Sequence, residues 1–347
     1  MTLQNTRAAP APEGRAQDPA PRTEPLTGAA AEAYLERRLA FPMATLKRFP
    51  KYFLIETINT CNARCIMCGI DFDKKAKAVM DDALFARIVE EIGRFRGHVE
   101  KVMLYLDCEP LLDKKLPGRI AQMKAAGVKI VNIASNASIL TEPRAEAILR
   151  AGLDEIYITV DSLKKEVFEA IRVRLKFEDV YNNTLGFLKL RDRLRPETRV
   201  RVQMIMQELN HAEADAFRAH WKDKVRPHDQ VVVQKAHNWA NAVDVMRFGD
   251  ESDVNAYPCI ALWGTAVIHV DGKLAMCCMD TESRHLLGNV GVRSIENIWT
   301  GEEMARLREK HTTGRRHEIA MCDGCTLWRE AKHAGDDAAP SQKTIPV

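Results

Sequence analysis

From residue 52 onward, the chain alternates between two hydrophobic patterns. Short apolar runs rich in β-branched residues predict buried strands. The longer stretches between them repeat apolar residues every three or four positions, as amphipathic helices do, and residues 82–92 are one example. The predicted strands cover residues 52–57, 101–106, 128–134, 155–160, 199–206 and 229–234.

Strands that alternate with helices in this way predict an α/β fold, in which crossover helices connect the strands of a parallel sheet. The pattern alone does not distinguish an open, doubly wound sheet from a partial barrel. In both architectures the functional residues lie at the C-terminal ends of the strands. Those strand ends are therefore the places where candidate site residues are sought.

The two ends of the chain have a different composition. Residues 1–26 are rich in Pro, Ala, Arg and Thr and predict a disordered tail. Residues 27–50 form an N-terminal segment whose helix formers predict a helix over 28–48 that covers one end of the sheet or barrel, with Pro42 breaking or kinking it. Residues 331–347 are expected to be a C-terminal tail.

Composition indicates a soluble globular protein of 347 residues, with 46% hydrophobic and 29% charged residues. A net charge of +3 is nearly neutral for this length, so neither a nucleic-acid nor a membrane partner is expected. The chain has no apolar run long enough to span a membrane and no pattern of a signal peptide. Nine cysteines without a secretion signal favour metal or redox chemistry over disulfides and predict a cytoplasmic protein.

Three cysteines follow the first predicted strand. Cys61, Cys65 and Cys68 have C-x3-C-x2-C spacing on one short loop. Three thiolates can bind three irons of a [4Fe–4S] cubane, which normally takes four cysteines, so the fourth iron is open to a ligand. A structural zinc site is the alternative, although zinc usually takes two well-separated pairs of ligands.

This motif resembles the signature of the radical S-adenosylmethionine (SAM) superfamily, with Met67 in place of the aromatic residue that often precedes the third cysteine. The resemblance implies a partial (β/α)6 barrel in which the open iron binds the amino and carboxylate groups of SAM. It also implies reductive cleavage of SAM to a 5′-deoxyadenosyl radical that abstracts a substrate hydrogen atom. An electron donor such as a flavodoxin or ferredoxin would supply the electron.

Further strand ends match the same family. The segment from Asp107 to Leu111 resembles the Gly-Gly-Glu-Pro motif, with Asp107 and Cys108 in place of the two glycines, and the resemblance assigns Glu109 to the SAM amino group. A polar residue at a strand end can equally cap the next helix. The remaining cofactor-binding candidates are Ser135 and Asn136 after the third strand, Asp161 and Ser162 after the fourth, and Gln203 on the fifth.

A second group of cysteines lies in the C-terminal third of the chain. A strand-like run over 262–270 leads through Asp271-Gly272, a strong hairpin signal, to Cys277 and Cys278. The hairpin is expected to bring Cys277 back toward Cys259, and Cys322 and Cys325 form a distant C-x2-C pair. These four thiolates can bind either zinc or an iron–sulfur cluster.

The segment over 255–330 resembles the C-terminal extension called SPASM, or its shorter form, twitch. The matching features are the C-x12-G-x4-C spacing from Cys259, the Gly288-Asn289 turn, a helix over 294–308 leading to Leu-x3-His, and the final C-x2-C. No cysteine follows Cys325, so the resemblance implies one auxiliary [4Fe–4S] cluster held by Cys259, Cys277, Cys322 and Cys325. The barrel itself would cover 51–240.

Two cysteines are left over. Cys108 and Cys278 are candidate hydrogen donors to a substrate radical, a role that thiols have in epimerases of the family. For Cys278, packing on the opposite face of its strand is the favoured alternative. The histidines show no metal-ligand spacing, but His237 and Trp239 lie between the two predicted domains and are candidates for lining a pocket.

The first functional hypothesis is oxidation or epimerisation of a carbinol carbon in a sugar, an aminocyclitol or a related natural-product intermediate. A single auxiliary cluster and the absence of an obvious N-terminal peptide-recognition domain favour a small-molecule substrate. The second hypothesis is modification of a ribosomally made peptide. A third, of a different class, is a non-catalytic zinc or iron–sulfur protein.

Overall fold

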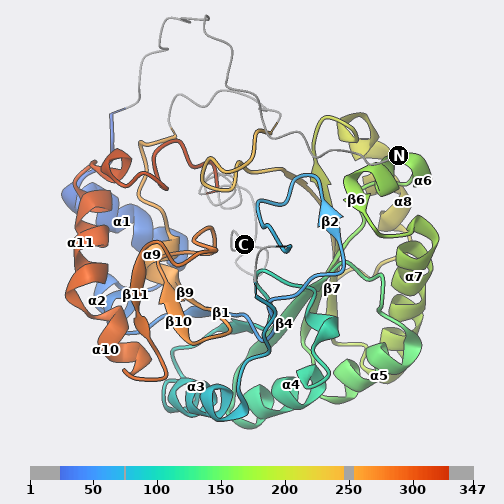
Figure 1. Ribbon diagram of the computed structural model, residues 1–347, viewed down its shortest axis with the longest axis horizontal. Coiled ribbons are helices and arrows are strands. Elements are labelled where there is room, and N and C mark those ends of the chain that lie inside the picture. The colour runs from blue at the N-terminus through green and yellow to red at the C-terminus, as the bar shows by residue number, and fades with distance from the viewer. Residues whose placement is uncertain (1–23, 74–75, 246–253, 328–347) are drawn as a thin grey trace, which may run out of the picture.

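A computed structural model describes residues 24–73, 76–245 and 254–327. A curved sheet forms the centre of the fold, and helices lie along its outer side (Figure 1). The sheet has nine strands in the order β11-β10-β9-β1-β3-β4-β5-β7-β8. Their bounds are β1 Tyr52–Ile55, β3 Lys101–Met103, β4 Ile130–Ser135, β5 Glu155–Thr159, β7 Arg199–Met206, β8 Gln230–Lys235, β9 Thr265–Ile268, β10 Lys273–Ala275 and β11 Leu286–Asn289.

The six predicted strands are present and pair in parallel from β1 to β8, which confirms the predicted α/β fold. Two predictions extended past the strand, because β1 ends at Ile55 and β3 at Met103. The residues that follow leave the ladder and enter the loops at the C-terminal edge. A separate pair of short strands, β2 Arg64–Cys65 and β6 Arg172–Val173, is antiparallel.

Helices connect the strands and bury one face against the sheet. In α3, for example, Phe85, Ile88 and Ile92 are almost fully buried, and the Asp81 carboxylate caps the first turn by accepting from the Ala83 and Leu84 N–H groups. The helices that connect β1 to β8 are α3 Asp82–Arg94, α4 Leu116–Ala125, α5 Glu142–Arg150, α6 Lys165–Ile171, α7 Phe177–Leu194 and α8 Ala214–Lys222. No described helix is both long and apolar enough to cross a membrane.

The predicted N-terminal helix is divided into α1 Gly28–Leu39 and α2 Met43–Arg48, with Pro42 at the break, as expected. These helices pack against α9 Ala261–Gly264, α10 Ile295–Trp299 and α11 Glu302–Thr312. These contacts do not test whether the two helices also cover an end of the barrel, so that expectation stays a prediction. Their apolar face is buried by the C-terminal helices, and the Trp299 indole N–H donates to the Leu46 carbonyl at 2.9 Å.

The C-terminal segment extends the main sheet. β9 pairs in parallel with β1, and the predicted hairpin at Asp271-Gly272 connects β9 to β10, with Gly272 at φ +82°. Two details of the prediction were wrong. Residues 261–264 form a short helix in place of the start of a strand, and the helix expected over 294–308 is two helices separated at Gly301.

β9 pairs with β1, so one continuous sheet runs through both of the predicted domains. The domain boundaries at 51–240 and 255–330 therefore stay a proposal. The predicted tails over 1–26 and 331–347 lie outside the described residues, except for residues 24–26.

Candidate active site with two cysteine groups

The N-terminal cysteine group, Cys61, Cys65 and Cys68, lies on the loop that follows β1. The loop is held in place by the β2–β6 pair and by a hydrogen bond from the Ile66 N–H to the Ile171 carbonyl at 3.1 Å. Burial raises the pKa of Cys61 to about 11 and that of Cys68 to about 12. A bound metal would replace these protons, because a coordinating thiol is deprotonated.

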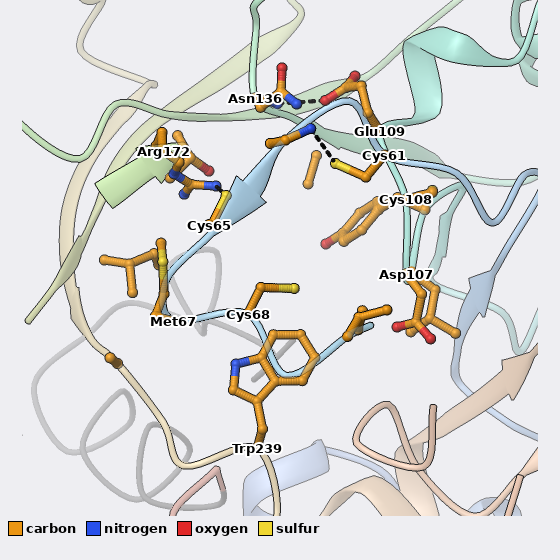
Figure 2. A pocket seen from close by; sticks show the side chains of 18 of the residues that line it. Cys61, Cys65, Met67, Cys68, Asp107, Cys108, Glu109, Asn136, Arg172 and Trp239 are labelled. Carbon is orange, nitrogen blue, oxygen red and sulfur yellow. Dashed lines mark hydrogen bonds between the residues drawn. The ribbon is translucent and has the colours of Figure 1, made fainter. Parts of the chain in front are cut away.

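All three thiols of this group line a cavity of about 240 Å³. The strand ends supply the other walls, as the parallel-sheet rule predicts. Figure 2 shows the three cysteines with Arg172 on one side and Asp107 across the cavity. Other lining residues include Met67, Tyr105, Cys108, Glu109, Ser135, Asn136, Thr159, Gln203, Gln234, Lys235, His237, Trp239, Cys278 and Met279.

Glu109 is at the centre of a hydrogen-bonded cluster on the cavity wall. Its carboxylate accepts from the Asn136 N–H at 2.7 Å, the Ser135 hydroxyl at 2.9 Å and the Leu111 N–H at 3.1 Å. Burial nevertheless raises the pKa of Glu109 to about 7. Glu109, Ser135, Asn136 and Gln203 thus lie together on one cavity, and their assignment to SAM stays a prediction.

The structure does not place Asp161 and Ser162 on the cavity wall. Asp161 is fully buried, where it pairs with the Arg172 guanidinium and accepts from the Ile205 N–H at 2.7 Å. Ser162 is also fully buried and donates to the Glu213 carboxylate at 2.9 Å. Both side chains already have partners within the protein. This arrangement therefore does not favour direct contact of either side chain with SAM.

Arg172 is a site residue that the sequence analysis missed. Its guanidinium lines the cavity, donates to the Cys65 sulfur at 3.3 Å and is held by Asp161. Its charge is maintained although burial alone would lower its pKa: Asp161 and Cys65 outweigh that effect and raise the pKa. A cation here can offset the charge of iron-bound thiolates or bind a carboxylate. A single arginine, here the first residue of the short strand β6, has no spacing signal by which it could have been found.

The C-terminal cysteine group is Cys259, Cys277, Cys322 and Cys325. Burial raises the pKa of the Cys277 thiol well above its usual value, and the thiols of Cys278, Cys322, Cys325 and Cys259 raise it further. The expected hairpin is present, and the assignment of these four cysteines to one site stays a prediction.

Arg316 and His311 organise this second group, and neither role was predicted. The buried Arg316 guanidinium donates to the Cys322 and Cys325 carbonyls at 3.0 and 2.9 Å, so it fixes the C-x2-C loop. His311 accepts from the Cys259 N–H at 3.1 Å. Burial lowers the pKa of His311 to about 3, and this neutral imidazole leaves its Nδ1 as the acceptor.

The cysteine spacing fits clusters better than single zinc ions. Four thiolates on one zinc at about 2.3 Å would hold their sulfur atoms roughly 4 Å apart. Among the residues that the structure describes, the metal-ligating side chains whose ligand atoms all lie within 4.8 Å of one another are Glu56, Asp107 and His269, and no cysteine is among them. Thiolates that each bind a different iron of a cubane need not be so close.

The two left-over cysteines both line the cavity. Cys108 and Cys278 lie on its wall, and Cys278 is also buried in the hydrophobic core, in line with the packing role that was favoured for it. After β10 ends at Ala275 the chain leaves the ladder, and strand alternation no longer predicts the direction of residue 278. Met279 also lines the cavity on this side.

The loop over 237–241 connects the two cysteine groups. Trp239 lines the cavity beside Cys68 (Figure 2) and packs on Gly69, where a Cβ atom would lie 3.1 Å from the indole side chain. From the same loop, the Asn238 side chain donates to the Gly324 carbonyl at 3.0 Å, between the two cysteines of the C-x2-C pair. The expectation that His237 and Trp239 line the pocket is confirmed.

Comparison with known families identifies both parts of the site. Residues 55–205 match the radical SAM superfamily, and residues 259–326 match an iron–sulfur cluster-binding domain called SPASM. The chain therefore belongs to the radical SAM superfamily and carries a C-terminal SPASM domain. Its cofactors are a SAM-binding [4Fe–4S] cluster, an auxiliary iron–sulfur cluster and SAM, which resolves the choice left open between iron–sulfur and zinc.

The individual proteins that resemble this chain have low sequence identity to it or match only a short part of it. An S-adenosyl-L-methionine-dependent 2-deoxy-scyllo-inosamine dehydrogenase from Niallia circulans is 22% identical over 277 residues, 78% of this chain and 90% of that protein. An uncharacterized protein from Treponema pallidum is 32% identical, but over 97 residues, so the alignment spans 28% of this chain and about a quarter (26%) of that protein.

Solved structures share the fold at low identity. BtrN in complex with AdoMet and 2-DOIA superposes with a TM-score of 0.55 at 18% identity, covering 80% of this chain and 93% of BtrN. Streptococcus suis SuiB bound to the precursor peptide SuiA gives a TM-score of 0.61 at 12% identity, covering 86% of this chain and 75% of SuiB. These likenesses show the fold alone.

Proposed function

We propose that this radical SAM enzyme dehydrogenates a carbinol carbon in a small polyhydroxylated substrate such as an aminocyclitol or a sugar. The observation that carries the proposal is a cavity that the N-terminal cysteine group lines and that the residues next to Cys277 also line. The N-terminal group lines it directly, and Cys278 and Met279, which follow Cys277 of the C-terminal group, line it from another element. A substrate in this cavity would lie between the radical source and an electron acceptor.

The chemistry of the walls also supports a small polar substrate. Gln203, Gln234 and Thr159 present amide and hydroxyl groups, and Asp107 presents a carboxylate. Such groups can donate to and accept from the hydroxyl and amino groups of a polyol. The similarity to an aminocyclitol dehydrogenase extends over 90% of that relative's length, although at 22% identity.

SAM bound to the first cluster supplies the hydrogen-abstracting radical when an electron donor such as a flavodoxin or ferredoxin reduces the cluster. We assign the three cysteines of the N-terminal group to that cluster and the four of the C-terminal group to the auxiliary one. Glu109, with Ser135 and Asn136, would hold the amino end of SAM. Arg172, positioned by Asp161, would balance negative charge beside Cys65.

The test uses 2-deoxy-scyllo-inosamine deuterated at all of its hydroxyl-bearing carbons. This probe is incubated anaerobically with reconstituted protein, SAM and dithionite. The proposal predicts deuterium in 5′-deoxyadenosine and an equal amount of carbonyl product by mass spectrometry. Cys277→Ala should keep SAM cleavage and lose the carbonyl product, whereas Glu146→Gln, an exposed change on α5, should match wild type. Deuterium transfer without a carbonyl product in the wild type would refute dehydrogenation of this probe.

Epimerisation is the second candidate, because the thiols of Cys108 and Cys278 both line the cavity and either can return a hydrogen atom to the opposite face of a radical carbon. In D2O an epimerase would place solvent deuterium on the carbinol carbon. Cys278→Ala or Cys108→Ala would abolish that incorporation and leave SAM cleavage intact. Peptide modification is supported by fold likeness to SuiB alone, and it would appear as a mass change in a precursor peptide.

A further inference from the structure

A second cavity, of about 250 Å³, lies at the edge of the sheet opposite the active-site cavity. Glu155, Arg199 and Gln230 line it, and they are the first residues of the parallel strands β5, β7 and β8. One water molecule needs about 10–15 Å³ on the same measure, so this space can hold a small polyatomic ion. The side chains of Arg199 and of His228, another lining residue, are 33% and 40% exposed, so the cavity opens to solvent. We call this space the basal cavity, and its walls also include Tyr157, Arg201 and Asp229.

Arg201 is the buried cation of the basal cavity, with only 5% of the residue exposed. Its guanidinium donates to Gln234 Oε1 at 3.0 Å and lies over the Tyr157 ring, 4.9 Å from the centroid. In the part of the chain that the structure describes, its Nε has no hydrogen-bond partner and no carboxylate pairs with it. A buried donor that lacks an acceptor is costly, and an oxyanion is the acceptor that the planar guanidinium fits best.

The nearest carboxylate is already shared by two other cations. Glu155 accepts from Lys101 Nζ at 2.6 Å on one oxygen and pairs with the Arg199 guanidinium at 2.7 Å on the other. Burial opposes the charge of Lys101, but Tyr157 and Glu155 outweigh that effect and raise its pKa. Arginine stays protonated in proteins. Even with Glu155 fully ionised, three cations (Lys101, Arg199 and Arg201) therefore face one carboxylate, a net charge of +2.

Asp229, the other acidic residue on the wall, does not offset this charge. Both of its oxygens accept from the Arg191 guanidinium, at 2.9 and 2.7 Å. The same carboxylate also accepts from the Val200 N–H at 2.8 Å and the Arg226 N–H at 2.9 Å. Asp229 and Arg191 thus neutralise each other, and the excess of positive charge in the basal cavity remains.

We propose that the basal cavity binds a phosphate dianion between Arg199 and Arg201, either as inorganic phosphate or as the phosphate group of a small metabolite. A phosphate monoester has a charge of about −1.5 to −2 at neutral pH, which matches the excess charge of the cavity. Arginine side chains bind phosphate oxygens through two parallel N–H donors. The site lies apart from the SAM and substrate cavity, so the proposal does not depend on the proposed function.

The test is isothermal titration of inorganic phosphate and of glycerol 3-phosphate into the reconstituted holoenzyme at about pH 8, where both are mainly dianions. The proposal predicts one saturable site per chain, and the anion that binds more tightly identifies the source of the phosphate group. Arg201→Gln and Arg199→Gln should each weaken binding at least ~10-fold, because each removes a charge-assisted hydrogen bond. Arg193→Gln removes an arginine of α7 whose side chain is 68% exposed, and it should match wild type.

Two comparisons locate the bound anion. Binding should be unchanged when SAM is present at saturation, because the SAM site is at the other edge of the sheet. Acetate, which has one negative charge, should bind at least ~10-fold more weakly than phosphate. Arg199→Gln alters only the partly exposed mouth of the cavity, so it gives the same test if the buried Arg201→Gln variant does not fold.

The absence of saturable binding by both phosphate compounds would overturn the proposal. Binding that keeps its wild-type affinity in Arg199→Gln, or that SAM displaces, would overturn it as well, because the anion would then lie elsewhere. Equal affinity for acetate and phosphate would refute the match between the dianion and the charge of the basal cavity.

Discussion

The replacement of Glu109 by Gln tests the assignment of the SAM site most directly. The carboxylate accepts three hydrogen bonds, from Ser135 and Leu111 on one oxygen and from the Asn136 N–H on the other. A glutamine has the same shape but only one oxygen. Its NH2 group must face one of these donors, and it also loses the negative charge that would attract the amino group of SAM.

The magnitude follows from that loss. A hydrogen bond to a charged group contributes about 1.5–3 kcal/mol, so SAM affinity should fall roughly 10- to 100-fold. Isothermal titration of SAM into anaerobically reconstituted protein measures this, and iron analysis verifies that the first cluster is retained. Glu146→Gln on the surface of α5 is the matched control. Unchanged SAM affinity in Glu109→Gln would refute the assignment.

The same residue predicts a pH dependence. Burial raises the pKa of Glu109 to about 7, so the carboxylate form is lost as the pH falls through about 7. The protonated form places a donor where three donors already converge, and SAM binding should weaken. Wild-type affinity should therefore rise with pH up to about 7 and then level off. Glu109→Gln should lack this dependence, and an identical pH profile in the variant would contradict the explanation.

Three further predictions concern the metal sites and their supports. Anaerobic reconstitution of wild type should give about eight irons, two cubanes, and replacing all cysteines of the N-terminal group by alanine should leave about four. Arg316→Met should release the auxiliary iron while the first cluster stays, because the C-x2-C carbonyls lose their donors, and iron counts test this with Arg315→Met as control. Arg172→Gln should destabilise the protein by about 3–5 kcal/mol in urea unfolding, because Asp161 is left as an unpaired buried charge. The added change Asp161→Asn should recover much of that loss, and no recovery would contradict the pairing.

A site residue could be predicted from the sequence where the adjacent strand determines the direction of its side chain. It could not be predicted where a contact with a distant segment determines that direction. Glu109, Ser135 and Asn136 line the cavity as expected, because each lies at or beyond the C-terminal end of a strand in a parallel sheet, and those ends form one edge. Asp161 occupies an equivalent position in the sequence. It instead turns to Arg172, a residue brought beside it by the β2–β6 pair, and that contact could not be foreseen from either segment alone.

The sequence by itself determined the order of strands and helices, the class of fold and the two cysteine groups, because hydrophobic period and cysteine spacing are properties of short segments. The tertiary structure alone decided that β9 adds to the sheet beside β1. That pairing places Cys278, the neighbour of Cys277, on the cavity wall and brings Glu56, Asp107 and His269 together. Strand partners and the side chains that meet between them depend on long-range burial, and no local pattern records which distant segment will supply it.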